Sequence, residues 1–161
     1  MSSRLDRPEE EEAVWPRRLT WLLRLGAVIE MLALPWVLVP RAWMEHSHEW
    51  LGMGPMPVGA VVDFTIRQSA FFYGLHGVLM WLLAGNVLRY RPLIKWIGWT
   101  YVLFGPVFFA INWSSGTPRW WTWCDPAVTL TFGLLILLCD QRVRAQHAQS
   151  AGSENPEFWP P

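Results

Sequence analysis

The sequence has little charge, a single lysine and too few cysteines for a disulfide framework. Only 16% of its 161 residues are charged, and 13 basic residues balance 13 acidic ones. A neutral balance argues against nucleic acid as a partner, because binding to phosphates needs an excess of basic groups. The low charge also departs from the average of soluble proteins, which argues against an ordinary water-soluble domain.

The two cysteines lie too far apart to be bonded to each other. Cys124 precedes the last apolar run and Cys139 closes it. About fifteen helical steps of ~1.5 Å separate them, several times the Cα distance that a disulfide allows. We therefore expect two free thiols near opposite faces of a membrane.

What the sequence does contain is long apolar runs, and 52% of its residues are hydrophobic. In the clearest run, residues 68–88, His76 is the only acidic or basic side chain. At ~1.5 Å per residue this run covers the ~30 Å hydrocarbon core of a bilayer. Three further runs of similar length lie at residues 19–39, 93–112 and 121–139. The sequence therefore predicts an all-α fold, a four-helix transmembrane bundle that occupies residues 17–140.

The ends of the chain and of the spans carry polar signals. Residues 1–16 predict a disordered acidic cytoplasmic tail, and residues 141–161 a polar cytoplasmic tail. We expect Pro35 to kink the first span, because a proline removes one helical hydrogen bond. Asp63 is expected to cap the second span, and Asp125 the fourth, with Pro126 as the first residue of that helix.

The first outer loop predicts a short amphipathic helix on the membrane surface. Trp43, Met44, Ser47, Trp50 and Leu51 recur at helical spacing, while Arg41, Glu45, His48 and Glu49 take the other side. Gly52, Gly54, Pro55 and Pro57 then end the helix.

The distribution of basic residues predicts the orientation. Nine of the thirteen flank the side of the N-terminus, three lie on the other side and Arg24 lies within the first span. Because positive charge collects on the cytoplasmic side, both termini are expected in the cytoplasm.

Tryptophan gathers on the outer side, where seven of the 13 are expected. We expect residues 40–67 and 113–125 to form an outer cap, with several of its indoles stacked as a lid over the bundle. Its candidate residues are Trp43, Trp50, Trp120, Trp121, Trp123, Asp63 and Asp125.

Four segments carry a family resemblance. They are WMEHSHEWLGMGPMP, RQSAFFYGLHG, RYRPLI and the PRWWT element before the last span, and they cover most of residues 35–139. In these the chain resembles a family of uncharacterised small four-helix bacterial inner-membrane proteins. It is more distantly similar to DoxX-like proteins in span number and size. The resemblance implies a multi-pass protein of the bacterial inner membrane and no particular activity.

Glu30 and His76 are the polar groups that most need a partner. Counted from the ends of their spans, both lie roughly 18 Å from the cytoplasmic boundary. A charged carboxylate at the bilayer centre costs about 2.5–3.5 kcal/mol, so we expect the two to pair, with Tyr73 completing the cluster. Two interpretations stay open. The cluster is either a proton-accepting or ligand-binding site, or a polar contact that fixes the helices in register.

Other sites are weaker. His46 and His48 are the candidate metal ligands, but residues at i and i+2 do not share a helix face. We expect no metal and no cofactor, since a haem held by two histidines needs a second histidine within a span. Two functions remain. One is a non-enzymatic accessory or structural subunit that binds a membrane partner. The other is a small enzyme or carrier that acts on a lipidic or quinone-like molecule at the Glu30 and His76 site.

Overall fold

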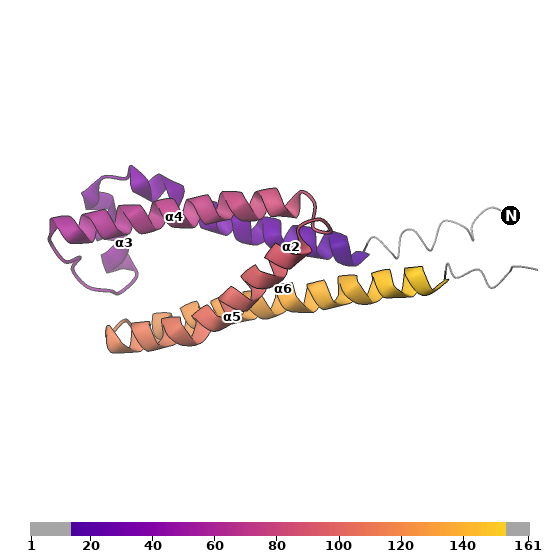
Figure 1. Ribbon diagram of the computed structural model, residues 1–161. Coiled ribbons are helices and arrows are strands. Elements are labelled where there is room, and N and C mark those ends of the chain that lie inside the picture. Colours follow the sequence, from indigo (N-terminus) through magenta and orange to yellow (C-terminus); the bar gives the residue numbers. More distant parts are fainter. Residues whose placement is uncertain (1–13, 154–161) are drawn as a thin grey trace, which may run out of the picture.

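The structure, a computed structural model, describes residues 14–153 and is built of helices (Figure 1). This part of the chain contains no strand, which confirms the all-α prediction. In order the elements are α2 (Val14–Met31), the 3₁₀ turn η1 (Leu34–Val37), α3 (Arg41–Trp50), α4 (Ala60–Ala84), α5 (Arg91–Ser114) and α6 (Arg119–Ser153).

Three helical segments are long and apolar enough to cross a membrane. They are Val14–Val37, Arg91–Ser114 and Arg119–Ala148. The predicted span at residues 68–88 is not among them. The helix that contains most of it, α4, begins at Ala60 and ends at Ala84. Its first turns include Asp63, Arg67 and Gln68, and these polar side chains lower the mean hydropathy of the helix. Three apolar helices fit a membrane protein, in agreement with the sequence.

The first predicted span is not one continuous helix. α2 begins at Val14, within the segment expected to be a tail, and ends at Met31. Pro35 lies in the 3₁₀ turn η1, so it ends the helix instead of kinking it. The reason is that a proline has no N–H for the helical ladder. Most of the predicted acidic tail, residues 1–13, lies outside the described residues.

The last helix is longer than predicted at both ends. α6 begins at Arg119, and Asp125 and Pro126 lie in its interior, so Asp125 is not its cap. The Asp125 carboxylate instead accepts a hydrogen bond from the Asn112 amide, at 2.9 Å. At the other end α6 continues past Asp140 to Ser153, where a tail was predicted.

The helices form two antiparallel hairpins that meet at one end. α4 packs on α2 and α6 packs on α5, while α2 also touches α6. The hairpins converge near the ends that carry the N-terminal part of α2 and the C-terminal part of α6, and they diverge toward the opposite end (Figure 1). We call these the basic end and the outer end. The fold is therefore a V-shaped pair of hairpins.

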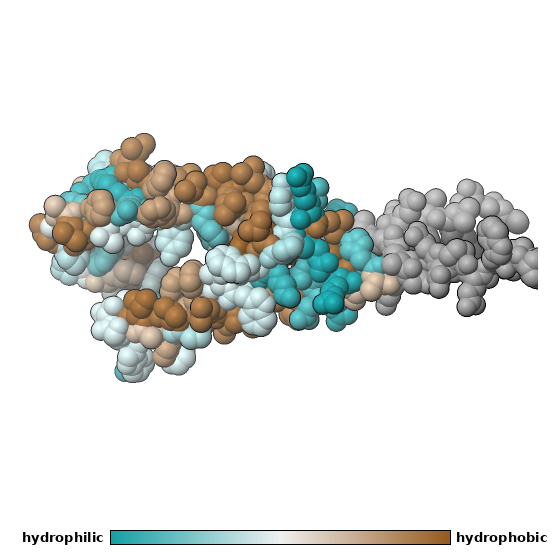
Figure 2. All heavy atoms as spheres, viewed as in Figure 1, coloured by the Kyte–Doolittle hydropathy of each residue, from teal (hydrophilic) through white to brown (hydrophobic). Residues whose placement is uncertain are grey.

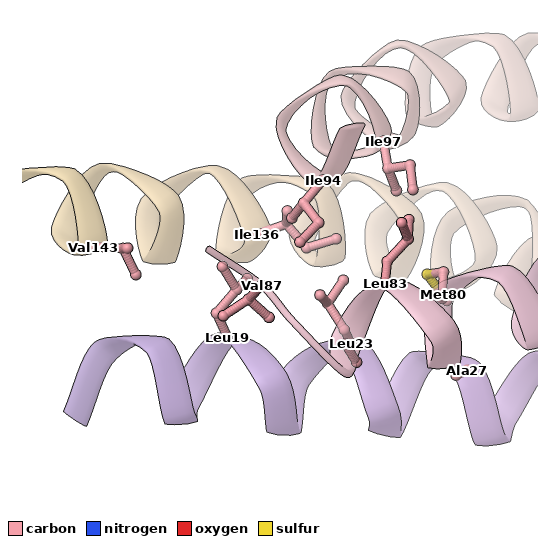
Figure 3. Packing of buried hydrophobic residues seen from close by; sticks show 11 residues of the cluster. Leu19, Leu23, Ala27, Met80, Leu83, Val87, Ile94, Ile97, Ile136 and Val143 are labelled. Atoms are coloured by element: carbon pink, nitrogen blue, oxygen red, sulfur yellow. The ribbon is translucent and has the colours of Figure 1, made fainter. Parts of the chain in front are cut away.

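The buried core lies where the hairpins converge. It draws side chains from every long helix and from the turn between α4 and α5 (Figure 3). The fully buried members are Leu19, Leu23, Ala27, Met80, Ile94, Ile136 and Val143. Because lipid is as apolar as leucine, close packing rather than escape from water holds such a core together.

Glycines allow the helices of each hairpin to approach closely. A Cβ atom at Gly77 of α4 would lie 2.7 Å from the Ala27 carbonyl oxygen of α2. One at Gly133 of α6 would lie 2.7 Å from the Gly98 carbonyl oxygen of α5. Neither distance is possible for a real Cβ atom. These positions thus set the spacing of the helices, as small residues do between membrane helices.

Polar contacts tie the basic end together. Arg91, at the start of α5, forms an ion pair of 2.8 Å with Asp140 of α6. Asp140 is only 5% exposed. The guanidinium groups of Arg18 and Arg142 both lie over the Trp15 ring, which joins α2 to α6. The end at which the hairpins meet is thus fixed by charges as well as by packing.

Candidate functional site

Glu30 and His76 are in direct contact, as the counting of depth predicts. Glu30 lies in the last turn of α2 and His76 in the second half of α4. The His76 Nδ1 atom is 2.6 Å from Glu30 Oε2. The Glu30 side chain is 13% exposed and the His76 side chain 37% exposed, so the carboxylate is the deeper of the two groups.

Tyr101 of α5 completes the cluster, and the sequence analysis missed it. Its hydroxyl donates a hydrogen bond to Glu30 Oε1, so both oxygens of the carboxylate have a partner. The Tyr101 ring also packs edge-on against Phe132, with 5.1 Å between centroids. The sequence did contain a signal for Tyr101. It lies ten residues after Arg91, or about 15 Å along a helix, which is close to the depth counted for His76.

Tyr73 does not take the predicted place in the cluster. It lies on α4 one turn before His76, and it is exposed into the same cleft. The described residues offer its hydroxyl no hydrogen bond to Glu30 or His76. A tyrosine from the other hairpin has this role, because the Tyr101 hydroxyl reaches the Glu30 carboxylate from α5.

The cluster opens into a cleft between the two hairpins. The cleft has a volume of about 430 Å³ and receives residues from α2, α4, α5 and α6. Figure 2 shows the hollow between the arm that carries α3 and α4 and the arm of α5 and α6. Aromatic side chains predominate in its wall. Its lining residues are Glu30, Ser69, Phe72, Tyr73, His76, Trp96, Ile97, Thr100, Tyr101, Phe104, Phe108, Asp125 and Thr129.

Polar groups occupy two levels of this cleft. Glu30, His76 and Tyr101 lie next to the core, against which Tyr101 packs. Asp125 lines the cleft farther toward the outer end, where Asn112 of α5 donates to it. Between these levels the wall is mainly aromatic. The aromatic wall matches the apolar body of a molecule, and the cluster of Glu30, His76 and Tyr101 matches a polar end.

His76 keeps one ring nitrogen available for a ligand. Its Nδ1 atom is engaged with Glu30, and no partner for Nε2 is present among the described residues. A neutral imidazole with Nδ1–H donating to a carboxylate presents Nε2 as an acceptor, and a protonated ring presents it as a donor. The Glu30 contact therefore orients the ring for recognition of a hydroxyl or carbonyl group.

The predicted outer-cap helix is present as α3, but its buried face is not the tryptophan face. Met44 is buried, whereas Trp43 and Trp50 are 71% and 80% exposed. Asp63 does not cap α4, whose N-cap is Gly59. The Asp63 carboxylate instead accepts a hydrogen bond from Arg41 of α3, which also binds Glu45 at 2.7 Å. Positive φ angles at Gly52 and Gly54 end the helix region, as predicted.

The tryptophans do not form the expected stacked lid. Among the described residues, the one ring contact between tryptophans joins the sequence neighbours Trp120 and Trp121, at 5.3 Å. Trp123 packs on Phe109 of α5 at 4.9 Å. The tryptophans of α3 and of α6 belong to different hairpins, and these diverge at the outer end (Figure 1).

The candidate metal ligands are not brought together. His46 is exposed, and the His48 Nδ1 atom lies 2.7 Å from the Gly54 carbonyl oxygen. No group of three or more potential ligands occurs in the part of the chain that the structure describes. Cys124 and Cys139 are free thiols, both on α6.

The chemistry open to this arrangement is the recognition of a polar group at the inner end of an aromatic cleft. The carboxylate of Glu30 fixes both the imidazole and the phenol, and the ring of His76 faces the cleft. Such convergent polar groups in an apolar pocket are typical of small-molecule sites. Comparison with protein-family models, with curated proteins and with solved structures finds no match to this chain.

Proposed function

We propose that the chain is a four-span protein of the bacterial inner membrane in which α4 also crosses the bilayer. The support is that α4 has 25 residues and packs along α2. Its charged residues, Asp63 and Arg67, lie near its outer end. Asp63 forms an ion pair with Arg41, and Arg67 donates hydrogen bonds to two backbone carbonyl oxygens. The excess of basic residues at the basic end favours cytoplasmic termini.

We further propose that the cleft binds a small amphipathic molecule, lipidic or quinone-like. The observation that carries this is the placement of Glu30, His76 and Tyr101 at the inner end of a cleft of about 430 Å³ with aromatic walls. An apolar tail would lie along Phe72, Phe104 and Phe108, and a hydroxyl or carbonyl head would hydrogen-bond to the free nitrogen of His76.

The role is binding or carriage rather than a defined reaction. The cleft offers a carboxylate and an imidazole in contact, which is a pair suited to moving a proton. A reaction would need a further reacting group, and the lining residues point to none. Binding alone accounts for the arrangement.

Co-purification tests this proposal. The protein is purified in mild detergent, and organic extracts are compared by mass spectrometry with those of two variants on α6. Thr129→Trp places an indole in the cleft, whereas Thr131→Trp places it on the exposed face. We expect a bound compound that is lost from Thr129→Trp and retained in Thr131→Trp. An identical set of compounds in all three samples would contradict a ligand in the cleft.

A second candidate, a non-enzymatic accessory subunit, is favoured by the exposed outer cap. Trp43 and Trp50 project from α3 with more than two thirds of their surface free. Exposed tryptophans are common at protein interfaces and at the lipid headgroups. Crosslinking in native membranes from a photoreactive residue at position 43 separates these roles. A discrete protein adduct supports a partner, whereas adducts with lipid only oppose it.

A further inference from the structure

A second recessed surface lies between α5 and α6, close to the basic end. It is a groove of about 320 Å³. Lys95 and Trp99 of α5 form one wall, and α6 forms the other with Leu134, Leu137, Leu138, Asp140, Gln141 and Arg144. None of these residues lines the cleft of the proposed function. The groove is thus a separate site.

The groove changes from apolar to basic along its length. The stretch from Leu134 to Leu138 lies within the apolar part of α6, and Arg144 lies beyond Asp140 where the helix becomes polar. Ten residues separate Leu134 from Arg144, which is about 15 Å along a helix. Lys95 lies one turn from the start of α5, on the same side as Arg144. The apolar part of the groove therefore ends at two basic side chains, Lys95 and Arg144.

Lys95 and Arg144 carry positive charge that no acidic side chain of the groove neutralises. Asp140 is the acidic group of the groove, and Arg91 already neutralises it at 2.8 Å. Arg142 is engaged over the ring of Trp15. Lys95 and Arg144 have no ion-pair partner among the described residues. Both are exposed, so they are available to an anion that approaches from the membrane surface.

We propose that this groove binds one anionic phospholipid, with its phosphate between Lys95 and Arg144 and an acyl chain along Leu134 and Leu138. Charge complementarity selects an anionic head, and the leucine wall beside Trp99 selects a lipid over a free anion. Basic pockets between membrane helices bind such headgroups, and each basic residue near the surface strengthens the attraction. Trp99 lies where an indole favours the interface.

The test is a lipid titration followed by native mass spectrometry. The protein in mild detergent is titrated with phosphatidylglycerol or with phosphatidylcholine of the same acyl chains. We expect phosphatidylglycerol to bind at one site and phosphatidylcholine to bind far more weakly. The double variant Lys95→Gln with Arg144→Gln should need about thirtyfold more phosphatidylglycerol for half-occupancy.

A matched control removes the same charge from the same end. Arg17→Gln with Arg89→Gln leaves the groove intact, because neither residue lines it, and it should bind phosphatidylglycerol like the unmodified protein. Leu134→Trp fills the groove while keeping both cations, and it should lose the lipid as well.

Three results would overturn the proposal. One is an equal loss in the control pair, which would mean attraction by net charge alone. Another is full binding by Leu134→Trp. The third is displacement of phosphatidylglycerol by excess inorganic phosphate, which would mean that the cations bind phosphate without the lipid. Circular dichroism of each variant verifies that its helices are retained.

Discussion

Glu30 is the residue on which the interior cluster depends, because both of its oxygens accept hydrogen bonds from other helices. Tyr101→Phe removes one donor and leaves Glu30 Oε1 without a partner. We expect a loss of about 1–2 kcal/mol in the free energy of unfolding in detergent. Tyr73→Phe is the control, since Tyr73 makes no hydrogen bond to Glu30, and it should change stability by less than about 0.5 kcal/mol. Equal losses in the two variants would mean that the bond to Tyr101 contributes nothing.

The contact between Glu30 and His76 predicts non-additive mutations. Glu30→Gln keeps shape and hydrogen-bonding capacity, so its loss should be modest. His76→Leu leaves the Oε2 atom of the Glu30 carboxyl without a partner and should cost about 1–3 kcal/mol. The double variant should lose less than the sum of the two losses, by at least about 0.5 kcal/mol. Unfolding of the four proteins in detergent measures this. Glu30→Gln combined with Thr131→Ala, a distant pair, should be additive. Additivity in the first cycle would contradict an energetic contact.

Sequence reasoning found two of the three residues in this cluster, for a physical reason. A helix rises by a fixed ~1.5 Å per residue, so counting from the charged flanks gives the depth of Glu30 and of His76. Depth alone does not give rotation about the helix axis. The direction in which a side chain points depends on how the helices pack, and that depends on contacts such as Gly77 on Ala27. For this reason Tyr73 was chosen and Tyr101 was missed.

Among the elements, the pair of α2 and α4 depends on one glycine. At Gly77 a methyl group would meet the backbone of α2, which cannot move aside as a flexible side chain does. We expect Gly77→Ala to lower the free energy of unfolding by about 1–3 kcal/mol through overpacking. Gly85→Ala at the end of α4 is the control, because its methyl group would meet one atom only, the Leu82 carbonyl oxygen, at 3.1 Å. A similar loss at both positions would refute close packing as the cause.

The turn after α2 depends on Arg67 of α4. Its guanidinium group donates to the carbonyl oxygens of Val37 and Val39, which follow the end of the helix near Pro35. Arg67→Gln removes this fork, so amide hydrogen exchange in residues 36–45 should become faster by about tenfold. The exchange rates of α5 should not change. Arg119→Gln, at the start of α6, serves as the control. Unchanged exchange near Val37 in Arg67→Gln would contradict the anchoring role.

The ends of the elements were the least predictable part of the fold. The Asp125 and Pro126 pair has the chemistry of a helix start, yet α6 begins earlier, at Arg119, and runs through the pair. At the observed start the Thr122 hydroxyl donates to the Pro118 carbonyl oxygen. The start of α4 lies eight residues before its apolar run, because Arg41 and Arg67 hold its polar first turns. Periodicity locates an apolar run well, but a polar helical extension depends on partners distant in sequence.

At the scale of the whole molecule, the number of spans is decided by the side on which three loops lie. Single cysteines at Val58, Asn86 and Ser115, in a background without Cys124 and Cys139, are tested with a membrane-impermeant maleimide on intact cells. Four spans predict labelling at positions 58 and 115 from outside and at position 86 only after lysis. If α4 does not cross, positions 58 and 86 will share a side. Ser115 is preferable to Gly116, whose φ of 68° would strain a cysteine.

The divergence of the two hairpins determines which concentration of a ligand sets its occupancy of the cleft. Their union at the basic end and separation at the outer end leave the cleft facing the neighbouring lipids, if all four helices cross the bilayer. A molecule that reaches Glu30 and His76 by that route has already dissolved in the membrane. Its occupancy is then set by its mole fraction among the lipids. A dissociation constant written in molar units would therefore change with the amount of membrane in the sample, whereas one written in mole per cent would not.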